Sequence, residues 1–124
     1  SEMCIRDRSA YCGATAAGCG AGAGVCYLHG GRYKEIAHTI VNAVAIDSGM
    51  ICDGAKPSCA MKLTSGVSTA VLSAMMAMDG RCVSSVEGII EEDVDRCIRN
   101  LTAIGREGMD ETDRLVLRIM TNKC

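Results

Sequence analysis

The spacing of apolar residues predicts a chain built from helices. In Tyr33–Ile46 and in Cys59–Met78, apolar residues recur every three or four positions, the period of one helix face. A third such stretch runs to about Ile104 behind Ser84–Glu87, whose serine and glutamate form a capping-box pattern. Strand-like alternation of apolar and polar residues does not occur. We therefore predict an all-α fold, a single compact domain of about five helices.

The two C-terminal helices are each expected to bury one apolar face. The predicted inward residues of the first are Ile89, Ile90, Val94, Cys97, Ile98, Leu101 and Ile104. Gly105 and Gly108 are expected to break this helix. Asp110 then caps a last helix, Glu111–Thr121, in which the predicted buried residues are Leu115, Val116, Ile119 and Met120.

Ala10–Gly31 carries no Asp, Glu, Lys or Arg and consists largely of glycine and alanine. A membrane span is long enough in principle, but glycine and alanine give little hydrophobicity. A nucleotide-binding loop at Gly18, Gly20 and Ala23 lacks the preceding apolar strand that such loops follow. We favour a buried helix whose small residues let other helices, or a cofactor, approach its backbone, ending at Gly30–Gly31.

Composition narrows the class of protein. A chain of 124 residues suits one domain, and a net charge of −2 with scattered basic residues does not indicate binding to nucleic acid or to an anionic membrane. The apolar fraction is 48%, yet there is no Phe or Trp and there are only three Tyr. A core of such small side chains requires helices that approach closely.

Cysteine usage indicates a reducing compartment. There are nine cysteines, an odd number, and no signal-peptide pattern precedes them, so we expect a cytoplasmic protein with metal-bound or reactive thiols rather than disulfides. Ser1–Ser9 carries four charges and shows no period. Its MCIRDR string resembles translated sequencing-adapter sequence, and we interpret residues 1–9 as a non-native or disordered terminus.

The stretch Gly49–Met61 is the strongest candidate for chemistry. Cys52 and Cys59 flank a turn predicted at Asp53–Gly54, and Pro57 can open a helix. Cys59 would then lie among the unpaired N–H groups of the first turn, where the helix dipole favours a thiolate. The alternative is that both cysteines are small buried packing residues.

Three further cysteines recur every seven residues at Cys12, Cys19 and Cys26, on one face of the glycine-rich helix. Packing explains Cys19 and Cys26 adequately. Cys12 differs, because it precedes Gly13 at the helix entrance, from where a second ligand could reach the turn between Cys52 and Cys59.

Other polar residues are weaker candidates. His38 has no carboxylate or cysteine at ligand spacing, so it is more typical of a partly exposed helix residue than of a base. The hydroxyls of Thr64 and Ser65 are expected to bond back to helix carbonyls. Lys56 and Asp53 could position a carboxylate, although such residues in turns are commonly solvated.

The run GMICDGAKPSCAMKLTSGVSTAVLSAM, together with ATAAGCGAGAGVCYLHGG before it and IRNLTAIGREGMDETDRLVLRIM after it, resembles the serine dehydratase-like alpha-subunit family. The resemblance is to the C-terminal part of that family and extends over residues 10–124. It implies a fragment of a longer enzyme. The seven-residue separation of Cys52 and Cys59 is closer to the single-chain iron–sulfur L-cysteine desulfidases than to the L-serine dehydratases, which carry a longer insert there.

The resemblance implies an oxygen-sensitive [4Fe–4S] cluster held by Cys12, Cys52 and Cys59. It implies a lyase that eliminates sulfide, or water, from L-cysteine, or L-serine, to give pyruvate and ammonia. The catalytic base is not identifiable in this chain. Implied partners are the small amino-acid substrate and the missing N-terminal part of the enzyme, with a homo-oligomer also possible in principle.

Three alternatives remain open. The chain could be an L-serine dehydratase alpha subunit, or a non-catalytic helical fragment whose cysteines only pack. It could also be a thiol-based metal carrier or zinc protein, although the sequence contains no C-x-x-C pair.

Overall fold

The computed structural model describes residues 12–52 and 56–123 of the chain. The predicted terminus Ser1–Ser9, the start of the predicted helix at Ala10 and the predicted turn at Asp53–Gly54 lie outside this part. Within it there are five α-helices, one π-helical segment and no strand. The prediction of an all-α domain of about five helices is confirmed.

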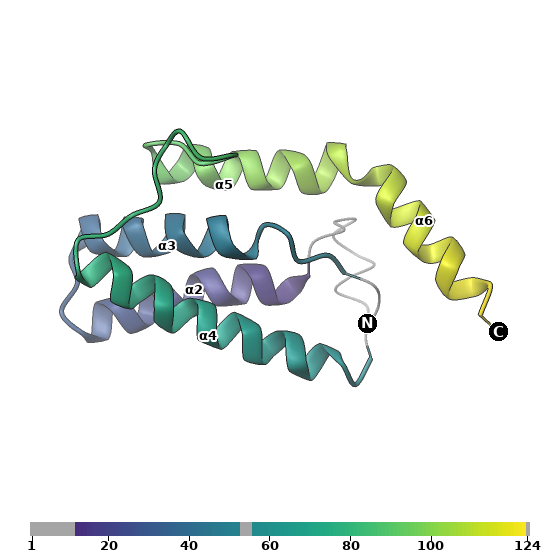
Figure 1. The fold of residues 1–124 in the computed structure, drawn as a ribbon, viewed down its shortest axis with the longest axis horizontal. Helices are drawn as coiled ribbons and strands as arrows, with labels where there is room; N and C mark the ends of the chain where they lie inside the picture. The colour runs from purple at the N-terminus through teal and green to yellow at the C-terminus, as the bar shows by residue number, and fades with distance from the viewer. Residues whose placement is uncertain (1–11, 53–55, 124) are drawn as a thin grey trace.

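Three helices form the body of the fold. They are α2 (Gly13–Leu28), α3 (Tyr33–Asp47) and α4 (Cys59–Met78), and each packs against the other two (Figure 1). The stretch Cys59–Met78, predicted from its apolar spacing, is α4, although the helix begins two residues after Pro57, which was expected to open it. Helix α3 extends one residue further than predicted. The bundle fixes which chain segments meet at each of its ends.

Glycines end two of these helices. Gly30 after α2 and Gly80 after α4 have φ of +85° and +75°, a left-handed conformation that glycine adopts without steric cost. The following N–H groups donate back into the helix, from Gly31 to Cys26 O at 2.9 Å and from Arg81 to Met76 O at 2.8 Å. Both ends are therefore Schellman motifs, which satisfy the last free carbonyls of the helix.

Small residues set the close approach of α2 to α4. Gly18, Gly22 and Gly66 are buried at this contact. A Cβ atom on Gly66 would lie 3.3 Å from Ala14 O, and one on Gly18 would lie 3.2 Å from Gly66 O. The Gly/Ala-rich helix is thus packed through its glycines, as its composition predicts, on the face toward α4.

A cluster of buried apolar residues joins α3 to α5 (Val94–Ala103). Its buried members are Val41, Val44, Ile90 and Cys97. Asn42, fully buried beside them, accepts a hydrogen bond from Val83 N–H at 2.8 Å through its amide oxygen. This hydrogen bond holds the connection between α4 and α5 against α3.

The helix predicted from Ser84 begins ten residues later than expected. Ser84 N–H does donate to the Glu87 carboxylate at 3.3 Å, as a capping box requires, but only turns follow. Gly88 has φ of +56°, and Ile90 beyond it is buried in the cluster with α3. We infer that burial of Ile90, which the non-helical segment allows, stabilises the fold more than a helix starting at Ser84 would. Helix α5 is instead capped by Asp93, whose side chain accepts a hydrogen bond from Asp95 N–H at 3.3 Å.

The prediction of a buried face on α6 (Asp110–Thr121) is wrong. Leu115, Ile119 and Met120 are 50%, 49% and 40% exposed, and Val116 is half-buried. The reason is that α6 packs substantially only against the π-helical segment η1 (Ile104–Gly108) and projects away from the body (Figure 1). Asp110 is its first residue rather than its cap, and on α5 Ile98 is likewise exposed rather than inward.

Candidate functional site

Cys12 lies at the entrance of α2 and contacts the segment that carries Cys52. Its side chain is buried, and its N–H donates to Met50 O at 3.1 Å. Its own carbonyl accepts from Thr15 N–H at 2.9 Å, which begins the helix. The backbone therefore brings Cys12 to within two residues of Cys52 along the neighbouring segment.

Cys52 and Cys59 are both half-buried, Cys52 before α4 and Cys59 in the first turn of that helix. Lys62 Nζ donates to Ile51 O at 3.1 Å, which joins that turn to the residue before Cys52. Cys59 is the first residue of α4, and its N–H donates to Lys56 O at 2.9 Å. The expectation of an unpaired N–H at Cys59 is thus wrong, because a tight turn precedes the helix and uses that donor.

These contacts bring three cysteine-bearing segments to one end of the bundle, where α2 begins, α3 ends and α4 begins (Figure 1). An iron–sulfur cluster requires more, because its ligand sulfurs must lie close to one another. Among residues 12–52 and 56–123, no three His, Cys, Asp or Glu side chains are grouped so that they could hold a metal ion. The thiol chemistry and the placement of the three backbone segments are compatible with a cluster, and the ligand set stays a prediction.

Asp47, the last residue of α3, is the one buried charged residue in the described part of the chain, at 2% exposure. Its backbone carbonyl accepts hydrogen bonds from Met50 N–H at 3.1 Å and from the Thr15 hydroxyl at 3.4 Å. Met50 and Thr15 also form backbone hydrogen bonds with Cys12. The Thr69 hydroxyl bonds to the Asp47 carboxylate, but Oδ2 has no partner among the described residues.

The sequence analysis missed Asp47, although one signal was present. Four residues separate Ile40 from Val44 and three separate Val44 from Asp47, so Asp47 continues the apolar face of α3. Charged residues are rarely buried without a partner, which makes such a position worth singling out as a functional candidate.

Two pKa values at this end of the bundle are raised. Burial raises the pKa of the Asp47 carboxyl above its ordinary value, opposed in part by the hydrogen bond from Thr69. The pKa of the half-buried Cys19 thiol is raised to about 11, first by burial and second by the negative charge of Asp47. Cys19 therefore stays protonated at neutral pH, in keeping with the packing role predicted for it.

Asp47 should make stability depend on pH. The folded carboxyl keeps its proton to higher pH than the unfolded one, so the free energy of unfolding is expected to fall as pH rises through the folded pKa of Asp47. Asp47→Asn removes that titration and should gain stability relative to the parent as pH rises from the ordinary carboxyl pKa through the raised pKa of Asp47. Urea unfolding at a series of pH values measures this difference. Glu92→Gln, at an exposed acid, is the matched control, and a pH-independent difference for Asp47→Asn would contradict the expectation.

The remaining predicted polar residues do not converge on the cysteines. His38 is half-buried on α3 and lines a cavity of about 250 Å³ with Cys82, Glu91 and Glu92, which the sequence did not place near it. In the described residues these side chains are not grouped as metal ligands. The Thr64 hydroxyl bonds back to Ala60 O at 3.4 Å, as expected.

The fold and the site together define an all-helical domain, in which cysteine-bearing segments meet at one end of a three-helix bundle. The chain belongs to the serine dehydratase alpha chain family, whose model matches residues 4–118. No solved structure is significantly similar to it. In the part of the chain that the structure describes, no helix is both long enough and apolar enough to cross a membrane.

The most informative relatives are longer proteins. The chain is 64% identical over 115 residues to the UPF0597 protein BF3560 of Bacteroides fragilis and 62% identical over 115 residues to a UPF0597 protein of Bacteroides thetaiotaomicron. It is 50% identical over 116 residues to the UPF0597 protein DSY1109 of Desulfitobacterium hafniense. These matches cover 93%, 93% and 94% of this chain but 27% of each relative, so the chain spans about a quarter of their length.

Proposed function

We propose that this chain is the cluster-binding part of an iron–sulfur lyase that eliminates sulfide or water from L-cysteine or L-serine. The hydrogen bond from Cys12 N–H to Met50 O carries the proposal, because it brings the first cysteine to the segment of the second in a member of the serine dehydratase alpha chain family. Cys12, Cys52 and Cys59 are the proposed ligands of a [4Fe–4S] cluster. When bound through three thiolates, such a cluster supplies an open iron site that acts as a Lewis acid.

In the proposed reaction the substrate loses its Cα proton and its β-substituent, which leaves as sulfide or water. Hydrolysis of the resulting aminoacrylate gives pyruvate and ammonia. The spacing of Cys52 and Cys59 resembles that of the single-chain L-cysteine desulfidases more than that of the L-serine dehydratases, and the proposal includes both substrates. An oxygen-sensitive cluster also favours the reducing cytoplasm as its compartment.

A second candidate is a non-catalytic helical module whose cysteines only pack. The observation in its favour is that no three ligand side chains are grouped among the described residues. Cys26 and Cys97 do pack, being fully buried. A zinc-binding or thiol-based carrier is a third possibility, and it would bind metal without sulfide.

Anaerobic reconstitution with iron and sulfide separates these functions. The proposal expects about four iron and four sulfide per chain, with the visible absorption of a [4Fe–4S] cluster. Folded protein that takes up neither would favour the packing module. Uptake of zinc without sulfide would favour the carrier.

The chain by itself is expected to show little or no release of pyruvate or sulfide. Elimination requires an oriented base and a pocket that excludes water, each commonly worth orders of magnitude in rate. Asp47, the buried acid near the cysteines, is covered by Gly18, on which a Cβ would lie 3.0 Å from Oδ2. Anaerobic turnover of L-cysteine and L-serine by the reconstituted chain measures this, with and without the remaining part of the Bacteroides fragilis relative. Robust turnover by the chain alone would contradict it and would make His38, Lys56, Cys19 and Cys26 the first residues to replace.

A further inference from the structure

Helix α4 has two faces that are both apolar. Toward α2 and α3 it buries small residues, among them Gly66, Ala70 and Ala74. On the opposite side large apolar side chains are exposed, and we call these the α4 outer face: Leu63, Val67, Val71, Leu72, Met75 and Met78. Lys62 is the only charged residue in the 20 residues of α4.

This pattern is that of an interior helix. Leu63, Val67, Val71 and Met75 follow one another at four-residue spacing, so they form a continuous stripe along the helix. A surface helix normally carries charged residues on its outer side. On α4 the exposed polar residues are the uncharged Thr64, Ser65 and Ser68. Val67 and Met75 are nevertheless 61% and 64% exposed.

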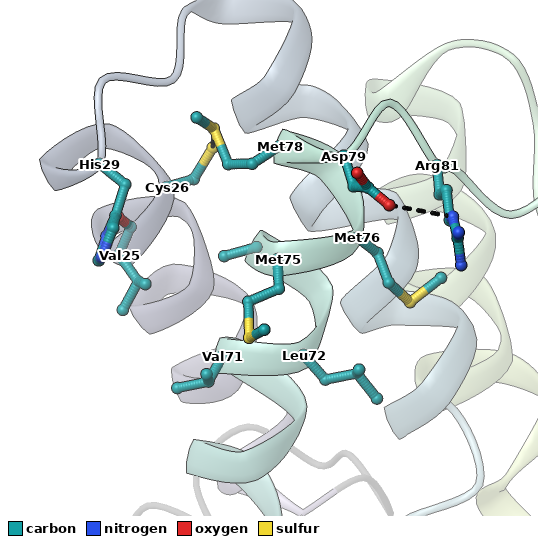
Figure 2. Close-up of a pocket in the computed structure, with 11 residues that line it drawn as sticks. Val25, Cys26, His29, Val71, Leu72, Met75, Met76, Met78, Asp79 and Arg81 are labelled. Atoms are coloured by element: carbon teal, nitrogen blue, oxygen red, sulfur yellow. Dashed lines mark hydrogen bonds and ion pairs between the residues drawn. The ribbon is translucent and has the colours of Figure 1, made fainter.

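The outer face borders a groove at the C-terminal end of α4. A cavity of about 670 Å³ lies there, between α4 and the end of α2, far along the bundle from Cys59. Figure 2 shows Val71 and Met75 of α4, and across from them Cys26 of α2 and His29, which directly follows α2. Methionine side chains adapt their shape to a partner, and a groove of this kind suits the apolar side of a helix or loop.

The greater length of the relatives indicates what could bind in this groove. The chain spans 27% of the full-length relatives, so about three quarters of such a protein is outside this structure. We propose that the α4 outer face and its groove are the docking surface for an apolar helix or loop from that missing part.

This inference rests on family membership and relative length, and the test requires neither a cluster nor turnover. The part of the Bacteroides fragilis relative that this chain lacks is produced separately, and its affinity for the chain is measured by calorimetry. Val67→Glu and Met75→Glu should each weaken binding by at least about tenfold, because they bury an unpaired charge. Val86→Glu is the matched control, since Val86 is 89% exposed in the connection before α5, and it should bind as the parent does. Circular dichroism confirms that each variant is helical.

Equal binding of the parent and Val67→Glu would overturn the proposal. A missing part that folds but does not bind, together with a dimer of this chain that Val67→Glu converts to monomer, would make a second copy the occupant and would also overturn it. If the missing part cannot be produced folded, the chain is fused to it in a full-length chimera. Oxidation of Met75 by hydrogen peroxide, followed by mass spectrometry, should then be at least about tenfold slower in the chimera than in this chain, and equal rates would count against docking.

Discussion

Serine in place of Cys12, Cys52 or Cys59 is expected to abolish assembly of an iron–sulfur cluster on this chain. A cluster iron requires a thiolate, and a serine hydroxyl does not ionise at neutral pH to replace it. Each substitution should lower iron and sulfide content by at least about tenfold after anaerobic reconstitution, and the triple variant should retain none. The measurement is iron and sulfide analysis with the visible spectrum, on protein shown to be helical by circular dichroism.

Two other cysteines provide controls. Cys19→Ser changes a half-buried thiol in the helix that follows Cys12, and Cys82→Ser changes an exposed one. Both should assemble the cluster as the parent does, because Cys19 stays protonated beside Asp47 and Cys82 lies in the connection after α4. A triple variant that kept the parent's iron and sulfide would show that the ligand assignment is wrong. Loss on Cys19→Ser alone would move the site deeper into α2.

The helices of the bundle could be predicted from sequence because their ends are marked locally. Glycine at Gly30 and Gly80 adopts the left-handed conformation that closes a helix, and the sequence predicts the end at Gly30–Gly31. The start of α4 at Cys59 follows from the turn and Pro57 just before it. Such signals act over a few residues, so no tertiary information is needed to use them.

The C-terminal part was predicted less well because its structure depends on contacts distant in sequence. The pattern at Ser84–Glu87 makes a local capping contact, but burial of Ile90 against α3 decides where the next helix starts. On α6 the spacing of Leu115 and Ile119 predicts an apolar face correctly. What the spacing cannot supply is the partner, and the described part of this chain does not cover that face.

Sequence reasoning likewise found some residues of the candidate site and missed others. Resemblance to the family suggested that Cys12 belongs with Cys52, and the contact of Cys12 with Met50 is compatible with that hypothesis, although the ligand set itself stays a prediction. Asp47 was not found, because its burial results from α2, α3 and α4 meeting around it. No short-range pattern encodes that three-way contact, and only its place on the apolar face of α3 hints at it.

Replacing Gly22 by leucine is expected to disrupt the bundle. A Cβ atom at Gly22 would lie 3.1 Å from Thr39 Cγ2 and 3.2 Å from Ala70 O, closer than ordinary packing allows. The Thr39 side chain cannot turn aside freely, because its hydroxyl donates to Glu35 O at 2.8 Å and the residue is fully buried. The backbone of α4 would have to move, so we expect a loss of about 3 kcal/mol in the free energy of unfolding, measured by urea denaturation.

Gly24→Leu makes the same chemical change one half-turn along the same helix. Nothing lies within 4 Å of a Cβ at Gly24, and the residue is exposed. Leucine is a better helix former than glycine, so this control should gain roughly 0.5 to 1 kcal/mol. Similar effects of the two substitutions would mean that helix propensity, and not the approach of α2 to α4, governs stability here. A stable Gly22→Leu variant with native helix content would show that the bundle can open at this contact, which contradicts the packing described for Gly18, Gly22 and Gly66.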